Sequence, residues 1–200
     1  LLSSSRAEVH RDAAGALWSL AASQDNQKLI AECKGITPLV ALLTDGSHGA
    51  QETAAGALHS LAALPANRVE IAEAGGVPAL TALFETSTEA AKTEAADALS
   101  SMVVENPDNQ SSVARSLVGL LHENASSPQA KENACELVYK LSLDPENRGA
   151  LSKWQAIEKL ALQLRDGTAA SQQNAAAALS QIALKSPQHR VQVTAQMIIL

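Results

Sequence analysis

Hydrophobic and polar residues follow the period of an amphipathic helix, and the same pattern returns along the chain. In residues 52–63, apolar side chains stand at Ala54, Ala57, Leu58 and Leu61. This i, i+3, i+4, i+7 spacing places them on one helical face, which we expect to be buried. The corresponding leucine or valine of each long segment recurs at intervals of 41, 41, 39 and 41 residues, at Leu17, Leu58, Leu99, Val138 and Leu179. A repeat of about forty residues that contains helices predicts an α-solenoid.

A second recurring feature follows each long helix. A polar pair, usually Asn followed by Arg or Gln, comes nine or ten residues after each leucine or valine of the first series. The pairs are Asn26-Gln27, Asn67-Arg68, Asn109-Gln110, Asn147-Arg148 and His189-Arg190. Just before three of these pairs stand Asn106-Pro107, Asp144-Pro145 and Ser186-Pro187. Each combines a helix-capping residue with proline at the first helical position, and so predicts the start of a helix.

The rest of each unit contains two short helices. Residues 67–74 form the first in the second unit, and Gly75-Gly76 can end it in the left-handed conformation. Pro78 then opens the second short helix, as Pro38 does one unit earlier. A polar stretch leads into the next long helix. The sequence therefore predicts three helices per unit, two short and one long.

The third unit departs from this pattern. Asn26 to Leu43 spans 17 positions, whereas Asn109 to Leu121 spans 12 and has no Gly-Pro break. We expect the two short helices to fuse or to lose a turn here. The fourth unit also lacks the break and has Lys153-Trp154 in its place.

The segment "NRVEIAEAGGVPALTALFETSTEAAKTEAADALSSM", residues 67–102, resembles an armadillo repeat, the family that includes β-catenin and importin-α. The resemblance covers essentially the whole chain and implies an all-α, right-handed solenoid of three-helix repeats. HEAT repeats are the nearest alternative, but they have two helices and lack the break seen at Gly35–Pro38 and Gly75–Pro78.

We expect a single armadillo-repeat domain over residues 1–200, taken from a longer array. Further repeats or another subunit should contact both of its ends. The expected segments are a long helix at 5–22, repeats at 25–65, 66–105, 107–144 and 145–185, and the start of a further repeat at 186–200.

The flank of each long helix that faces away from the core is the candidate binding surface. Stacked long helices would align these flanks into one groove, and in families similar to this one such a groove holds extended or helical peptides. The expected lining residues are Gly15, Trp18, Ser19, Glu52, Gly56, His59, Ser60, Asp97, Ser101, Glu132, Glu136, Tyr139, Lys140 and Gln181.

The composition of this surface predicts the kind of partner. Its first half is small and nearly neutral, whereas Asp97, Glu132 and Glu136 bring negative charge that Lys140 interrupts. We expect a protein or peptide partner that is small-residue or helical at one end and basic at the other. Trp18 either anchors this partner or covers a contact with a preceding unit.

Importin-α-like repeats hold a basic nuclear-localisation peptide with Trp and Asn side chains on the long helix. Neither set of residues is present here. The Trp column is Gly15, Gly56, Asp97, Glu136 and Ala177, and the Asn column is Ser19, Ser60, Ser101, Lys140 and Gln181. The resemblance therefore implies a binding role without classical nuclear import.

Composition and charge exclude several other functions. The net charge of −6, with scattered Lys and Arg, argues against a nucleic-acid partner. No apolar run reaches the length of roughly 18–20 residues that a membrane-spanning helix needs. The five histidines lie in different units, and we find no catalytic, metal or cofactor motif.

Isolated aromatic and sulfur side chains fit packing better than chemistry. We expect Trp154, Cys33 and Cys135 to be packed, and His59 to be an ordinary surface histidine. Two isolated cysteines favour a reducing compartment, and we expect the cytoplasm. The nucleus and the interior of an organelle are the alternatives. The sequence thus predicts a non-catalytic protein–protein interaction scaffold. The alternative is a structural subunit packed into a large assembly through its convex face or its ends.

Overall fold

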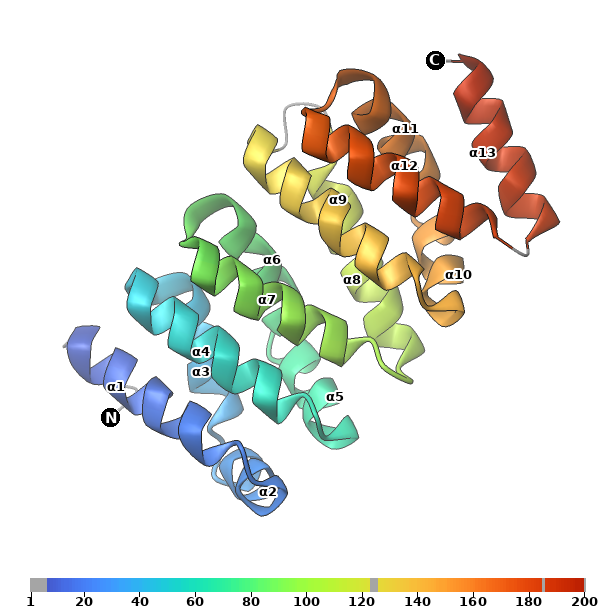
Figure 1. Ribbon diagram of the computed structural model, residues 1–200. Helices are drawn as coiled ribbons and strands as arrows, with labels where there is room; N and C mark the ends of the chain where they lie inside the picture. The colour runs from blue at the N-terminus through green and yellow to red at the C-terminus, as the bar shows by residue number, and fades with distance from the viewer. Residues whose placement is uncertain (1–6, 123–125, 185, 200) are drawn as a thin grey trace. The chain divides into compact units, whose positions relative to one another are not determined.

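The computed structural model describes residues 7–122, 126–184 and 186–199, and within these ranges the chain forms thirteen α-helices and no strand (Figure 1). The ends of the expected helix 5–22 and of the expected segment 186–200 lie partly outside the described residues. The helices are α1 (Ala7–Leu20), α2 (Gln24–Glu32), α3 (Ile36–Asp45), α4 (His48–Leu61), α5 (Pro65–Glu73), α6 (Gly76–Thr86), α7 (Glu89–Met102), α8 (Pro107–Leu120), α9 (Pro128–Ser142), α10 (Pro145–Lys153), α11 (Ala156–Asp166), α12 (Ala169–Ala183) and α13 (Pro187–Ile199).

The helices follow the predicted order of two short helices and one long helix. This order occurs in α2–α3–α4, in α5–α6–α7 and in α10–α11–α12. The third repeat differs, because the 14-residue helix α8 precedes the long helix α9 directly. The expected irregularity is thus confirmed, and it takes the form of one continuous helix in place of two short ones.

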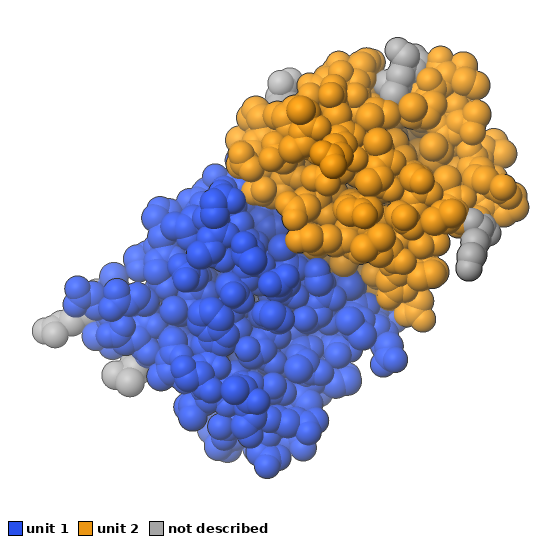
Figure 2. Space-filling model, in the orientation of Figure 1, with its two compact units in different colours: residues 1–109 blue, residues 110–200 orange. Residues whose placement is uncertain are grey.

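The chain divides into two compact units, residues 1–109 and 110–200 (Figure 2). In unit 1 the long helices α1, α4 and α7 lie side by side, and α3 and α6 pack behind them (Figure 1). In unit 2 the long helix α12 packs against α9 and against α11. The boundary between the units falls within α8, and a single domain over residues 1–200 stays a prediction.

The predicted apolar stripes form the core of each unit. Ala54, Ala57, Leu58 and Leu61 in α4 are fully buried. The matching residues of the next two long helices are buried as well: Ala95, Ala98, Leu99, Met102, Ala134, Leu137, Val138 and Leu141. Burying each leucine contributes roughly 1.5–3 kcal/mol, and the small alanines let neighbouring helices approach closely.

The recurring asparagine caps the carboxyl end of the long helix before it. Asn67 donates its Nδ2–H to the carbonyl oxygen of Leu61 at 3.0 Å, and also to that of Gln27 in the preceding repeat at 3.4 Å. The same bond to the preceding long helix is made by Asn26 at 3.0 Å and by Asn147 at 3.1 Å. The same carbonyls of the long helices also accept a backbone N–H from the turn that follows, at 3.2 Å in each case, so the asparagine adds a second hydrogen bond at the end of the long helix.

In two repeats the residue after this asparagine is an arginine, which hydrogen-bonds to backbone carbonyls at the ends of long helices. The guanidinium of Arg68 donates to the carbonyl of Ala62 at 2.7 Å and to that of Val104, one repeat further on, also at 2.7 Å. Arg148 makes the corresponding bond to Ser142 at 2.7 Å. Both arginines are buried, and each places its charge on carbonyl oxygens rather than in solvent.

A residue in the left-handed conformation separates the two short helices of each regular repeat. Gly75 has φ 84°, as the sequence predicted, whereas Gln155 (φ 64°) and Lys34 (φ 60°) adopt this conformation without being glycine. Gly76 lies inside α6 instead, where a Cβ would come within 2.5 Å of Ile71 Cγ2. The predicted caps Asn106, Asp144 and Ser186 are confirmed, since each side chain accepts a backbone N–H at 3.0–3.2 Å.

Candidate functional site

The outer face of α1, α4 and α7 in unit 1 is the predicted place of nine of the fourteen binding residues. It lies opposite the buried stripe, so its side chains are at least partly open to solvent. Asp97 and Ser19 are exposed, and Glu52, Ser60 and Ser101 are half-buried. Gly15 is also half-buried, with space for a Cβ at 3.7 Å from Thr53 Cγ2.

Gly56 differs from the prediction, because it is buried. A Cβ added there would lie 2.4 Å from Cε2 of Trp18, so the indole of α1 rests directly on the backbone of α4. Trp18 itself is half-buried. Within the described residues, its ring contacts the following long helix. The close backbone approach expected for a partner at Gly56 is therefore made within the chain.

His59 faces a carboxylate that the sequence analysis missed. Its Nδ1 lies 3.4 Å from Oε2 of Glu94 on the neighbouring helix α7, and the two side chains are 39% and 22% exposed. The signal in the sequence is spacing, since Glu94 stands three residues before Asp97 and so shares its side of the helix. His59 is accordingly not an isolated surface histidine.

The three carboxylates Glu52, Glu94 and Asp97 give the outer face of unit 1 an excess of negative charge, and we call them the acidic face. Glu52 and His59 are seven residues apart and so lie on the same face of α4. Glu94 of α7 contacts this face through His59. Among the described residues, neither Glu52 nor Asp97 makes an ion pair. Their charge is therefore available to a partner.

In unit 2 the predicted charges are largely compensated within the chain. Glu136 forms an ion pair with Lys140 at 2.8 Å, one helical turn away. Glu132 is half-buried and accepts a hydrogen bond from the hydroxyl of Thr168 at 2.9 Å. Gln181 accepts one from the guanidinium of Arg148 at 3.5 Å, and Tyr139 is half-buried. Glu136 and Glu132 therefore both have partners within unit 2. The predicted groove residues Glu52 and Asp97, which make no ion pair with a described residue, lie in unit 1.

The remaining candidate residues are distributed between core and surface. Cys135 is buried, and this burial, followed by the nearby Glu132, raises the pKa of its thiol to about 12. Cys33 is exposed, contrary to the expectation that it is packed. Trp154 is only half-buried, and the guanidinium of Arg115 lies 5.4 Å from the centre of its ring. This cation–π contact replaces the expected position in the core.

Two further features concern the described residues as a whole. They contain no group of three or more His, Cys, Asp or Glu side chains that could hold a metal ion. None of their helices is both long enough and apolar enough to cross a bilayer.

Comparison with known proteins is consistent with this architecture. Residues 23–63 match the sequence model of the armadillo/β-catenin-like repeat. An engineered protein from the Northeast Structural Genomics Consortium is 25% identical over 100% of this chain and 83% of its own, with a TM-score of 0.70. None of the curated proteins compared with the chain matches it.

Designed armadillo repeat proteins share the fold. One of them, solved in complex with the peptide (KR)4, is 20% identical over 99% of this chain and 85% of its own, with a TM-score of 0.68. Another is 21% identical over 98% of this chain and 84% of its own, with a TM-score of 0.63. Together with the matched repeat and the recurring three-helix unit, these structures show that the chain has the fold of an armadillo-repeat solenoid.

Proposed function

We propose that the chain is a non-catalytic scaffold that binds a polypeptide segment along the outer face of its long helices. The observation that supports this most strongly is the acidic face of unit 1, where Glu52 and Asp97 lack ion pairs among the described residues. A partner with lysine or arginine at matching positions would supply the missing countercharge, with the shape and charge complementarity that sets binding rate and specificity.

Two further observations favour a polypeptide partner. One designed armadillo repeat protein with this fold was solved in complex with the basic peptide (KR)4, so the fold is compatible with binding a positively charged peptide. The small side chains Ser60 and Ser101 flank the acidic residues and are half-buried, which leaves room for an extended backbone. The half-buried Trp18 offers an apolar edge at one end of this surface.

The proposal is tested by fluorescence anisotropy with labelled (KR)4 and with a peptide in which glutamate replaces every basic residue. The basic peptide should bind, more weakly as salt is raised, and the acidic peptide should not. Asp97→Lys and Glu52→Lys should each weaken binding about tenfold or more, which corresponds to roughly 1.4 kcal/mol.

The matched control is Glu73→Lys, which makes the same change of charge at an exposed residue of α5, away from the acidic face. An equal loss of affinity in this variant would mean that only the total charge matters. That result, or binding that neither Asp97→Lys nor Glu52→Lys weakens, would contradict the proposed site.

A structural role in an assembly is the second candidate, and α13 favours it. Val191 and Ile198 are 69% and 80% exposed, and Met197 is 47% exposed. Val191 and Ile198 are seven positions apart and so lie on one face of the helix, and exposed apolar residues that share a face often mark a protein interface. Replacing Val191 and Ile198 with Ser should leave (KR)4 binding unchanged but reduce self-association or co-purification with a fixed neighbour, as measured by light scattering.

A further inference from the structure

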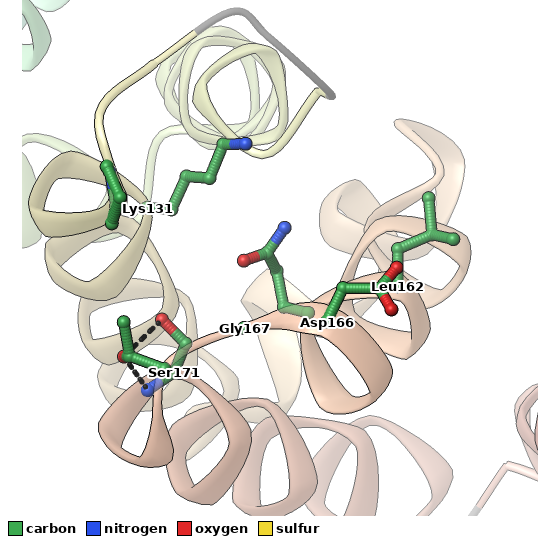
Figure 3. A pocket seen from close by; sticks show the side chains of 8 residues that line it. Lys131, Leu162, Asp166, Gly167 and Ser171 are labelled. Atoms are coloured by element: carbon green, nitrogen blue, oxygen red, sulfur yellow. Dashed lines mark hydrogen bonds between the residues drawn. The ribbon is translucent and has the colours of Figure 1, made fainter.

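Unit 2 contains a cavity of about 360 Å³, bounded by the amino-terminal ends of α9 and α12 and the carboxyl end of α11 (Figure 3). This volume is at the lower end of the range for ligand pockets, roughly 300–1,000 Å³. The lining residues are Pro128, Lys131, Leu162, Gln163, Asp166, Gly167, Thr168 and Ser171. None of them belongs to the acidic face, so the cavity is a separate site.

Gln163 occupies a position that is apolar in unit 1. The carbonyls of Leu42, Leu83 and Gln163 each accept the N–H of the residue that ends their helix, at 3.1, 3.1 and 2.8 Å. Leu42 and Leu83 are core residues, whereas Gln163 is buried to the same degree, with 7% of its surface exposed, and has a polar side chain. Its carboxamide makes no hydrogen bond to any described residue. The amide is not one of the fully buried polar groups without a partner, so it is open to the cavity, where a ligand can hydrogen-bond to it.

Ser171 is a second polar substitution at the same cavity. The backbone N–H groups of Ala50, Ala91 and Ser171 each donate to the capping hydroxyl three residues earlier, at 3.4, 3.2 and 3.1 Å. The three residues therefore correspond. All three are buried, but only Ser171 is polar, and its hydroxyl oxygen lies 3.2 Å from that of Thr168. The lining is thus polar at two positions that unit 1 fills with apolar side chains.

In unit 1, two side-chain hydrogen bonds of one residue close the position that corresponds to the cavity. These bonds cannot form in unit 2. In unit 1, Gln51 donates to the carbonyl of Leu43 at 3.1 Å and accepts from the hydroxyl of Ser87 at 2.7 Å. By position relative to the helix caps, Lys131 corresponds to Gln51, and Gly167 corresponds to Ser87. Gly167 has no side chain to contribute, and the third repeat has no separate second short helix that could correspond to α3. The space therefore stays open.

The charges around the cavity favour an anion. Lys131 makes no ion pair or hydrogen bond with a described residue, so its ammonium is uncompensated. Asp166 also lines the cavity, but Arg165 donates to its carboxylate at 2.9, 2.9 and 2.6 Å and so offsets part of its charge. Figure 3 shows Lys131 and Asp166 on opposite sides of the opening, with Leu162 beyond Asp166. The described residues of the lining thus present one cation, one carboxamide and an apolar wall.

From this arrangement we propose that the cavity binds an aliphatic carboxylate, whose oxygens accept hydrogen bonds from Lys131 Nζ and Gln163 Nε2. A charge-assisted bond from the ammonium and a neutral one from the amide match the two oxygens of a carboxylate. Leu162 and Pro128 contact the aliphatic chain. The same group can arrive as a free dicarboxylic acid or as a glutamate side chain in a peptide.

The test is isothermal titration calorimetry with two probes, glutarate and the peptide acetyl-Ala-Glu-Ala-amide. Binding of glutarate alone identifies a small-molecule site, and binding of the peptide alone identifies a side-chain site. Glutaramide and acetyl-Ala-Gln-Ala-amide are the neutral controls, and each should bind at least tenfold more weakly than its charged counterpart. Equal affinity for a charged probe and its neutral control would overturn the carboxylate assignment.

The variants come from the repeats themselves. Gln163→Leu introduces the residue of unit 1, so the protein should stay folded while probe affinity falls tenfold or more. Lys131→Gln should have the same effect on affinity. Lys92→Gln, the corresponding change in α7, should leave affinity unchanged, because Lys92 pairs with Glu89 at 2.7 Å and lies in unit 1. Failure of both probes to bind at millimolar concentration would overturn the proposal, and so would affinity that neither Gln163→Leu nor Lys131→Gln changes. Neither result would bear on the acidic face.

Discussion

The indole ring of Trp18 in α1 covers the backbone of Gly56 in α4, so that a Cβ at position 56 would lie 2.4 Å from Cε2 and 2.5 Å from Cζ2 of the ring. A small residue on one long helix therefore accommodates a large residue on the next. This contact positions two neighbouring helices of unit 1 and fixes one end of the surface to which we assign partner binding.

Gly56→Ala should destabilise the protein by about 1–3 kcal/mol, because the new methyl group forces the indole out of its position. The measurement is chemical denaturation followed by circular dichroism. Gly149→Ala is the control, since Gly149 is exposed in α10 and a Cβ there meets no atom within 4 Å. That change should stabilise by about 0.5–1 kcal/mol through helix propensity.

A double-mutant cycle separates the contact from other effects of Gly56→Ala. In a Trp18→Ala background the added methyl should cost little, because the ring that it displaces is gone. The same penalty in both backgrounds would show that the indole does not cause the destabilisation.

Asn67→Ala should destabilise by about 1–3 kcal/mol, because it removes two hydrogen bonds that the buried carboxamide donates to the carbonyls of Leu61 and Gln27. Asn26→Ala is the matched change one repeat earlier. It removes a single bond, to Leu20, from a half-buried site and should cost less. Thermal unfolding of the two variants provides the comparison, and a greater loss for Asn26→Ala would contradict the capping role.

Burial of Cys135 should make stability fall at high pH. Its thiol has a pKa of about 12 in the folded chain against 9.0 for an unperturbed cysteine, so between these values the unfolded chain releases a proton that the folded chain keeps. The free energy of unfolding should therefore decrease as pH rises from about 9 to 12, by up to roughly 1.4 kcal/mol per pH unit from this group. Urea denaturation of wild type and Cys135→Ala measures the difference, and the variant should show a shallower fall.

The two cysteines should also differ in alkylation. Iodoacetamide should modify the exposed Cys33 in the native protein, and Cys135 only after denaturation. Peptide mass spectrometry distinguishes the sites. Modification of Cys135 at a rate similar to that of Cys33 under native conditions would contradict its buried position.

The periodicity of apolar residues predicted most of the helices and their buried faces, because the spacing of Ala54, Ala57, Leu58 and Leu61 depends only on helical geometry. The missing residues of the third repeat likewise predicted that its two short helices fuse or lose a turn, and the structure has the continuous helix α8 there. The recurring asparagine was visible in the sequence as a pattern. Its capping role needed the distance from Asn67 to Leu61.

The candidate sites were less predictable, because they depend on contacts between neighbouring repeats. The sequence placed Gly56 and His59 on the outer face but gave no sign that Trp18 covers the first or that Glu94 pairs with the second. The cavity beside Gln163 depends on which residues stand opposite one another across two repeats. A single helical pattern does not contain that information.

The central claim is that the acidic face of unit 1 holds a basic segment of another polypeptide. Chemical-shift mapping of the isotope-labelled chain with (KR)4 tests it most directly. The account predicts that the largest perturbations cluster at Glu52, His59, Glu94 and Asp97 in α4 and α7. Perturbations confined to α5 and α6, or no perturbation at a saturating peptide concentration, would contradict it.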